Sequence, residues 1–331
     1  MGRLLTFLTD CRTNSTATLS GLVACLFLLS ACSSPAPQST VPAADQKADP
    51  ITKESITEPG LEFGQPAVRF GILAIDGARS VHSRYAPLVE YLATEVGRPF
   101  ELVVLNQESQ FTKVDAGTVD FVMSNPLASV QIQKQHDTDF LVTLQRPNTG
   151  AKFSALIITR HDSSIQTLSD LRGKKVACVD FKTAAAGCLF QMFHLMENDI
   201  DPFQEFSSFV ENPSQDNIVL GVLNGTIDAG FIRTGQLEKM VKSGLIQNMD
   251  DIRILEPQSD DFFFTHTTAL YPEWPIAAVN GTDPALAKTV QTSLLEMSSE
   301  HPALLSANLA GFTQPEGYES IDRLLESLSL D

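Results

Sequence analysis

The sequence predicts an α/β protein with two lobes facing one ligand cleft, each built from a mixed, mostly parallel sheet with helices on both faces. Three observations support this prediction. Short apolar runs alternate with helical patterns along the chain, which is typical of parallel sheets covered by helices. A Gly-Thr-(Val/Ile)-Asp motif followed by an apolar strand occurs twice, at 117–123 and 225–232. Small residues join a strand to a helix at 179–187.

The composition limits the function classes. The chain has 331 residues, of which 43% are hydrophobic, enough for a large core and two lobes. Its 23 Lys and Arg against 40 Asp and Glu give a net charge of −17, which argues against broad binding to nucleic acid. The His residues show no metal spacing, and no nucleophile-elbow or phosphate-loop motif occurs. We therefore expect neither an enzyme nor a bound cofactor or metal, although local amides and arginines can still hold an anion.

Residues 1–31 are predicted to form a lipoprotein signal peptide. Arg3 and Arg12 precede an apolar core at 19–29 that is too short to span a membrane. The sequence LSAC then ends at Cys32 and resembles the site at which a small-residue segment is cleaved before a lipidated cysteine. The alternative is an ordinary secretory signal followed by a coincidental cysteine.

Residues 32–66 are predicted to be the lipidated cysteine and a flexible tether. The segment is rich in Ser, Pro, Ala and charged residues, a composition that does not build a core. Acylation of Cys32 with groups such as palmitate would hold the protein on the periplasmic side of the envelope. Ser33, rather than Asp, follows the cysteine and favours the outer membrane over the inner one.

The first lobe is predicted to comprise 67–153 and 256–331. Gly97 and Gly117 are placed to end helices, and Asn125-Pro126 is placed to begin one. The expected strands are 68–75, 100–105, 120–123 and 140–144. The first expected helix begins between 80 and 83 and stops at Gly97, and a short second helix ends at Gly117. A third covers 127–135, and two more, at 283–298 and 318–328, close the chain.

The second lobe is predicted to comprise 154–255. Its expected strands are 155–159, 176–179, 228–232 and 252–255, and its expected helices follow the turn at 183–187 and cover 168–173, 215–224 and 235–243. The segment FFFTHTTA at 262–269 is rich in β-branched and aromatic residues and is predicted to be the strand that crosses back. The segment 271–275 between its prolines is predicted to be a rigid turn.

The turn at 183–187 is the predicted centre of the site. Thr183 is a candidate N-cap, and the first amides of the following helix would remain unpaired and favour an anion. The alternative is a tight strand-to-helix turn that binds nothing. Cys178 and Cys188 bracket this turn, and in an oxidising compartment they either form a disulfide that braces it or remain two small buried residues.

Four segments resemble the phosphate, phosphite and phosphonate (PhnD-like) family of type II periplasmic solute-binding proteins. They are SRYAPLVEYL (83–92), GTVDFVMSNPLASV (117–130), SSIQTLSDLRGKKVACVDFKTAAAG (163–187) and NGTIDAGFIRTGQLE (224–238). The resemblance covers about 67–300 and implies a monomer that closes two lobes over a small anionic ligand for an ABC permease. The binding domains of tetrathionate-type sensor kinases share Arg233-Thr234 and the turn at 271–275. This second likeness implies the alternative partner, a sensor-kinase ectodomain.

The chain departs from this family at the turn itself. In the phosphonate binders a Ser-Thr-Ser-Gly run supplies hydroxyl donors, whereas Ala184, Ala185, Ala186 and Gly187 stand here. A phosphonate oxygen needs several donors to offset its desolvation. The alanines therefore favour a more weakly hydrated anion, such as a sulfur oxyanion or an organic acid.

The residues predicted to contact the ligand lie in the turn, at the ends of the repeated strands, or in the crossing segments. They are Tyr85, Ser124, Asn125, Thr183, Ala185, Ala186, Gly187, Arg233, Thr234 and His266. Arg233 either supplies a forked countercharge or forms an ion pair that braces the lobes. Ser124 and Asn125 either contact the ligand or cap the next helix.

The remaining candidates have packing alternatives. Tyr85 either walls the cleft or packs in the core, and His266 either bonds the ligand or is satisfied within the crossing strand. Tyr271 and Trp274 either line the cleft or pack at the hinge. Arg146 is a further candidate, with a surface loop as its alternative.

Overall fold

The structure, a computed structural model, describes residues 65–330. Every described residue belongs to one compact unit. The predicted signal peptide, Cys32 and all but the last two residues of the tether lie outside the described residues. Between residues 65 and 330, no helix has the length and apolar character needed to cross a bilayer.

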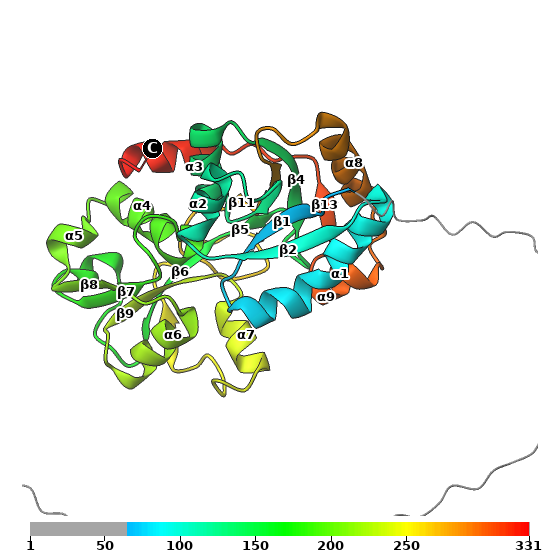
Figure 1. The fold of residues 1–331 in the computed structure, drawn as a ribbon. Helices are drawn as coiled ribbons and strands as arrows, with labels where there is room; N and C mark the ends of the chain where they lie inside the picture. Colours follow the sequence, from blue (N-terminus) through cyan, green and yellow to red (C-terminus); the bar gives the residue numbers. More distant parts are fainter. Residues whose placement is uncertain (1–64, 331) are drawn as a thin grey trace, which may run out of the picture. The chain divides into compact units, whose positions relative to one another are not determined.

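A six-stranded sheet has the order β13-β4-β12-β3-β1-β2 (Figure 1). Strand β1 pairs in parallel with β2 and β3. Strand β12 is antiparallel to both β3 and β4, and β13 is antiparallel to β4. The strands are β1 (Val68–Leu73), β2 (Phe100–Leu105), β3 (Phe121–Met123), β4 (Asp139–Gln145), β12 (Pro275–Ala278) and β13 (Gly311–Thr313).

Helices cover both faces of this sheet because successive strand residues point to opposite sides. On one face, Phe70 and Ile72 belong to the same buried cluster as Leu88 of α1. On the other face, Val122 packs in a cluster with Ile132 of α3. The helices are α1 (Ala78–Val96), α2 (Ser109–Asp115), α3 (Pro126–His136), α8 (Pro284–Leu295), α9 (Pro302–Ala307) and α10 (Glu319–Ser327).

A five-stranded sheet has the order β10-β6-β9-β7-β8. Residues of β6 alternate between its faces, with Ile157 clustered with Phe190 of α4 and Ile158 with Ile218 of α6. The strands are β6 (Ala155–Arg160), β7 (Lys175–Cys178), β8 (Ser208–Glu211), β9 (Ala229–Arg233) and β10 (Ile252–Ile254). The helices are η1 (Leu168–Leu171), η2 (Ala185–Leu189), α4 (Phe190–Glu197), α5 (Pro202–Glu205), α6 (Gln215–Asn224) and α7 (Gln236–Lys242).

The chain leaves the first sheet after β4 and returns to it at β12. A small ladder of β5 (Lys152–Phe153) with β11 (Tyr271–Pro272) lies at the crossing. The α/β class and the mixed sheets are as predicted. The expectation that parallel pairs dominate is wrong, because β7, β8 and β9 pair in parallel while β6 is antiparallel to both its neighbours.

Helix α1 begins earlier than predicted and contains Pro87 in its interior. A proline there cannot donate to the carbonyl four residues back, which is that of Ser83. Ser306 of α9 supplies the missing hydrogen bond, because its hydroxyl donates to the Ser83 oxygen over 3.1 Å. Packing of α9 thus permits a proline that the sequence alone placed near the helix start.

The predicted crossing strand at 262–269 is wrong. This segment has no strand geometry, and its threonine hydroxyls replace part of a ladder. The Thr267 amide donates to the Ala155 oxygen (2.9 Å), and the Thr267 hydroxyl accepts from the Ile157 amide (3.2 Å). Helix α9 and strands β12 and β13 were not predicted. The segment 271–275, predicted to be a rigid turn, has ends that belong to β11 and β12.

Candidate functional site

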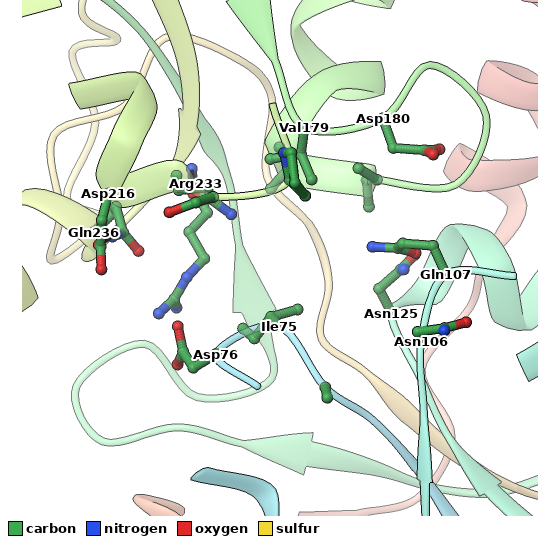
Figure 2. A pocket seen from close by; sticks show the side chains of 18 of the residues that line it. Ile75, Asp76, Asn106, Gln107, Asn125, Val179, Asp180, Asp216, Arg233 and Gln236 are labelled. Atoms are coloured by element: carbon green, nitrogen blue, oxygen red, sulfur yellow. Dashed lines mark hydrogen bonds between the residues drawn. The ribbon is translucent and has the colours of Figure 1, made fainter. Parts of the chain in front are cut away.

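A cleft of about 660 Å³ lies at the carboxyl ends of the parallel strands of both sheets. We call it the main cleft. Open α/β sheets bind ligands at this position. Its lining includes Asp76 after β1, residues 106–108 after β2, Asn125 after β3, residues 179–180 after β7, 213–216 after β8, and Arg233 at the end of β9 (Figure 2).

The turn 184–187 forms one wall of the main cleft. Its first helical turn is a π-helix, in which the Leu189 amide donates to the Ala184 oxygen over 3.1 Å. The amides of Ala185, Ala186 and Gly187 make no hydrogen bond within the described part of the chain, since the first amides of a helix have no acceptor before them. They are therefore available to a ligand.

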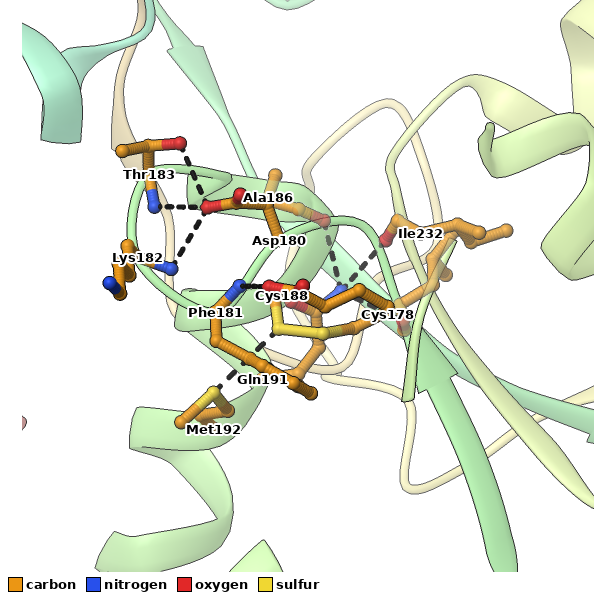
Figure 3. Close-up of a disulfide and its surroundings, with 12 residues drawn as sticks. Cys178, Asp180, Phe181, Lys182, Thr183, Ala186, Cys188, Gln191, Met192 and Ile232 are labelled. Atoms are coloured by element: carbon orange, nitrogen blue, oxygen red, sulfur yellow. Dashed lines mark hydrogen bonds between the residues drawn. A yellow bond between two sulfur atoms is a disulfide. The ribbon is translucent and has the colours of Figure 1, made fainter. Parts of the chain in front are cut away.

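Thr183 does not cap this helix, so that prediction is wrong: Ala184 is the N-cap residue and makes no side-chain cap. The Thr183 hydroxyl lies 2.9 Å from Oδ1 of Asp180 and 2.9 Å from Oε1 of Gln107. Oδ1 of Asp180 also accepts from the amides of Lys182 and Thr183, at 2.9 and 2.7 Å. Asp180 therefore holds the loop before the turn (Figure 3).

A disulfide joins Cys178 at the end of β7 to Cys188 of η2, directly after the turn (Figure 3). Beneath it, Nε2 of buried Gln191 lies within 2.9 Å of the Ala186 oxygen and 3.0 Å of the Ile232 oxygen. Gln191 thereby links the turn to the strand that ends at Arg233. One buried side chain therefore connects two elements that line the main cleft.

Gly187 is needed for packing against the end of β7 as well as for the access of a ligand to the turn amides. A Cβ at this position would lie 2.8 Å from Cγ2 of Val179, closer than non-bonded carbon atoms approach. The Gly187 oxygen also accepts from the Val179 amide over 2.9 Å. The glycine therefore lets the end of β7 lie directly against the turn.

Asn125 takes the capping role and also links two loops that line the main cleft. Its Oδ1 accepts from the Ala128 amide over 3.1 Å and caps α3. Its Nδ2 donates to the Thr183 oxygen over 3.0 Å and so connects the two sheets' loops. Ser124, in contrast, is fully buried and donates to Oε1 of Gln110, away from the residues that line the main cleft.

Arg233 is the cation of the main cleft without a carboxylate partner. Within residues 65–330 no carboxylate oxygen lies within ion-pair distance of it, and its buried Nε has no hydrogen-bond partner. Burial lowers the pKa of its guanidinium below the ordinary value, and the positive charge of Arg146 lowers it further. Figure 2 shows its side chain reaching toward Asp76. It does not form the lobe-bracing ion pair that was the alternative.

Asp76 is shared by two cations. Its Oδ1 accepts from Nζ of Lys239 over 2.8 Å, and its Oδ2 lies 3.8 Å from Nη1 of Arg84. Burial alone would raise its pKa, but the hydrogen bond from Lys239 and the charges of Lys239, Arg233 and Arg84 lower it below the ordinary value. The carboxylate is therefore ionised at neutral pH.

A second cavity, of about 440 Å³, lies beside the main cleft. We call it the arginine cavity, because Arg84, Arg146, Arg233 and Lys239 line it. Arg146 is not in an exposed surface loop: its Nε lies 3.3 Å from Oε1 of Glu273, and their side chains are only 19% and 6% exposed. Burial would lower the pKa of Arg146, but the charge of Glu273 raises it above the ordinary value.

The other predicted residues are distributed around these cavities. Tyr85 lines a space of about 30 Å³ between Arg84, Arg146 and Arg233. Thr234 lines the arginine cavity and donates to the Ser154 oxygen over 3.1 Å.

His266 lines none of the three cavities. It is buried between the Thr268 oxygen (2.7 Å from Nδ1) and Asp260 (3.1 Å from Nε2). Trp274 lines the main cleft, whereas Tyr271 stacks on Phe190 with ring centroids 3.8 Å apart and packs at the crossing.

The structure thus brings Asn125, Ala185, Ala186, Gly187 and Arg233 together in one cleft. The lining residues that were not predicted include Asp76, Asn106, Gln107, Gln236 and Lys239. Asp76 and Asn106 could have been predicted from the sequence, because they directly follow the predicted strands 68–75 and 100–105, and ligands bind at such strand ends. Within the described residues, no three His, Cys, Asp or Glu side chains converge as a metal site would require.

The family described as "ABC transporter, phosphonate, periplasmic substrate-binding protein" matches residues 70–319. The chain belongs to this family, which is a family of extracytoplasmic solute-binding proteins and not of enzymes. A curated relative, the "Tetrathionate sensor histidine kinase TtrS" of Salmonella typhimurium, is 31% identical over 229 residues. This match covers 68% of the chain and 38% of the kinase, so the chain corresponds to only part of that relative.

Solved structures share the fold. PhnD1 from Prochlorococcus marinus, in complex with methylphosphonate, aligns with a TM-score of 0.67 and 13% identity over 80% of this chain and 99% of its own. XAC2383 from Xanthomonas citri, bound to ATP, aligns with a TM-score of 0.64 and 22% identity over 80% of this chain and 96% of its own. These likenesses establish the two-lobed periplasmic-binding-protein architecture.

Proposed function

We propose that this periplasmic substrate-binding protein captures a small anion in the main cleft. One observation carries the proposal: the free amides of Ala185, Ala186 and Gly187 and the unpaired Arg233 line the same cleft. Amides at a helix start favour negative charge, and a guanidinium supplies a forked pair of donors. The amides belong to η2, which follows β7, and Arg233 ends β9.

The acidic residues of the main cleft do not contradict an anionic ligand. Asp180 accepts three hydrogen bonds within its own loop, and Asp216 accepts from Gln236 and lies 3.8 Å from Nζ of Lys239. One oxygen of each carboxylate is thus engaged by protein donors. The exposed Glu108 also lines the cleft, and Arg233 is the cleft cation with no carboxylate within ion-pair distance, whereas Lys239 pairs with Asp76.

The anion is proposed to be weakly hydrated, such as a sulfur oxyanion or a small organic acid. Ala184, Ala185 and Ala186 provide methyl groups and no hydroxyls, and each is at most 5% exposed. Tetrathionate, for which the Salmonella relative is named, fits this class, because its sulfonate ends spread their charge over several oxygens. Phosphonate would lose more hydration here than neutral amides return.

Closure of two lobes, 67–153 with 256–331 and 154–255, is the proposed binding motion. Connections between the loops of the two sheets support it. Asn125 reaches the Thr183 oxygen (3.0 Å) on one side of the main cleft, and Lys239 reaches Asp76 (2.8 Å) on the other. A ligand between them would be enclosed by contacts that link both lobes.

The proposal is tested by thermal-shift screening of the purified protein. Tetrathionate, thiosulfate, methanesulfonate, methylphosphonate and small carboxylates would be titrated singly. A ligand at 100 times its Kd stabilises the folded state by about 2.7 kcal/mol, which for a protein of this size raises Tm by several degrees. No shift with any anion at millimolar concentration would contradict the proposal.

The downstream partner is proposed to be an ABC permease, with a sensor-kinase ectodomain as the second candidate. The family description supports the first, and the identity to the sensor kinase supports the second. Crosslinking of the liganded protein in membranes would identify which protein it contacts. A crosslink to a kinase ectodomain with none to a permease would replace the first candidate with the second.

We also propose a monomer anchored through acylated Cys32 on the periplasmic side, in the outer membrane. The segment LSAC before residue 33 supports the anchor. Metabolic labelling with palmitate should mark the wild type and not a Cys32→Ala variant, and the label should fractionate with the outer membrane. Equal labelling of both proteins would exclude Cys32 as the acylated residue.

A further inference from the structure

Arg233 stands where three spaces meet. It lines the main cleft, the arginine cavity, and the space of about 30 Å³ between them. Asp76 is the other charged residue common to all three. A ligand group on either side of Arg233 could therefore share its guanidinium.

The charges on the two sides of Arg233 differ in sign. Beyond the groups that both spaces share, the charged residues that the main cleft adds are all acidic, namely Glu108, Asp180 and Asp216. The arginine cavity adds Arg84 and Arg146 against one carboxylate, Glu273. With the shared residues included, four cations and two carboxylates line the arginine cavity, whereas two cations and four carboxylates line the main cleft. The arginine cavity is therefore the more attractive place for a second negative group.

The carboxylates around the arginine cavity do not neutralise it. Glu273 is paired with Arg146 at 3.3 Å, and Asp76 is divided between Lys239 at 2.8 Å and Arg84 at 3.8 Å. The guanidinium of Arg233 has neither carboxylate within ion-pair distance, and its buried Nε is unpartnered. Buried charges ordinarily have a partner.

Neutral donors complete the cavity. Asn148, Thr149 and Asn308 line it together with the cations. Side-chain amides and a hydroxyl beside arginines match the several acceptor oxygens of a sulfonate or carboxylate. Arg84 is held for this role, because its Nη2 donates to the Ala307 oxygen over 2.9 Å.

We propose that the arginine cavity binds the second anionic end of the ligand, which is therefore a linear dianion. One end lies at the turn amides and Arg233 in the main cleft, and the other lies among Arg84, Arg146 and Arg233. This inference rests on the proposed function, because it assigns the ligand class of the same site. Tetrathionate and α,ω-dicarboxylates have the required form, whereas methanesulfonate and monocarboxylates have only one anionic end.

The test compares matched two-ended and one-ended anions by calorimetric titration: tetrathionate against methanesulfonate, and adipate against hexanoate. The wild type should bind the preferred two-ended anion at least 10-fold more tightly than its one-ended partner. Arg84→Gln should weaken the two-ended anion about 10- to 50-fold, the loss expected for one charge-assisted contact, and change the one-ended anion less than twofold. Arg79→Gln, an exposed change on the same helix outside all three cavities, is the matched control.

The outcomes separate the two proposals. Equal wild-type affinities for one-ended and two-ended anions, or an equal loss of both in Arg84→Gln, would overturn the dianion and leave the anion site in place. Binding of none of the four anions by the wild type would contradict both. If Arg84→Gln does not fold, Arg84→Lys keeps the charge and removes the fork, and the same selective loss is expected at smaller size.

Discussion

The two Gly-Thr-(Val/Ile)-Asp segments have the same local structure and different ends. Gly117 and Gly225 both follow a helix with positive φ, 59° and 76°, which glycine adopts without strain. The amides of Thr118 and Thr226 each donate back to a carbonyl five residues earlier, at 2.9 and 3.0 Å. Sequence similarity here reflects a repeated helix-to-strand connection.

The aspartates of the two segments also make the same kind of contact, a hydrogen bond from a backbone amide of a neighbouring strand. Oδ2 of Asp120 accepts from the Arg69 amide over 2.7 Å, and Oδ2 of Asp228 accepts from the Lys175 amide over 2.8 Å. Each carboxylate thereby holds the start of the neighbouring parallel strand. Asp120 makes an additional contact with the same residue, since its Oδ1 accepts from the side-chain Nη2 of Arg69 over 2.6 Å.

The strands that follow end differently. Strand β3 runs into buried, neutral Ser124 and Asn125, which bond to other protein groups. Strand β9 ends at Arg233, which has no partner in the described part of the chain for its buried Nε. The shared motif thus builds the scaffold, whereas the residues after it, which the repeats do not share, build the site.

The largest expected effect comes from the end that differs. Arg233→Gln should weaken anion binding about 100-fold, which corresponds to about 2.7 kcal/mol, because a guanidinium that bonds an anion is removed. Its free energy of unfolding should not fall, since Arg233 has no ion pair to lose. Calorimetric titration and urea denaturation measure the two quantities. Loss of affinity below threefold would show that Arg233 does not contact the ligand.

The shared aspartates should affect stability and not binding. Asp120→Asn should lower the free energy of unfolding by about 1 to 2 kcal/mol, because a partly exposed charge-assisted pair is lost. Asp228→Asn should cost about 0.5 to 1 kcal/mol, because a single hydrogen bond is weakened. Both are read from urea midpoints at unchanged m-value. A change in anion affinity above twofold in either folded variant would break the division between scaffold and site.

The Asp120 contribution should depend on pH. Burial would raise the pKa of Asp120, but the hydrogen bonds and charge of Arg69 lower it below its ordinary value of 3.8. A carboxyl with a lowered pKa in the folded state stabilises that state above the unfolded pKa, and this stability is lost as pH falls through the folded pKa. The stability difference between wild type and Asp120→Asn should thus be full at pH 6 and shrink below pH 3.8. A difference that grows on acidification would contradict the assignment.

The smallest expected effect comes from the neutral end. Asn125→Ser keeps an oxygen that can cap α3 and removes the donor to the Thr183 oxygen. Anion affinity should fall about threefold, since one neutral hydrogen bond across the cleft is lost. A matched change, Asn198→Ser at the end of α4, removes a neutral donor outside the three cavities and should leave affinity unchanged. A loss above 30-fold for Asn125→Ser would give this residue a direct ligand contact.

Much of the fold was predictable because the strands are short apolar runs with glycine-terminated helices between them. The strand predicted at 262–269 was wrong, because β-branched and aromatic residues also occur in an irregular segment whose threonines hydrogen-bond to a neighbouring strand. The Thr267 hydroxyl accepts a hydrogen bond from the Ile157 amide, and residue propensities do not predict such a side-chain contact. Strand β12 was hidden by Pro275, which occupies the first position of a strand, where its missing amide is tolerated.

The site was only partly predictable for a similar reason. Asn125 and Arg233 were predicted because they lie at strand ends, and residues 185–187 were predicted because they form the small-residue turn. The importance of Arg146 depends on Glu273, which is 127 residues away in sequence, and no local pattern links them. The π-helical geometry of the turn was equally hidden, because three consecutive alanines are compatible with several helix types.

The central claim is that an anion is held between the turn amides and Arg233, and a crystal structure with the tightest-binding anion tests it most directly. Oxygens of the anion should lie about 2.7–3.1 Å from the amide nitrogens of Ala186 and Gly187 and from the guanidinium of Arg233. An anion bound elsewhere, or an Arg233 guanidinium directed away from it, would contradict the account.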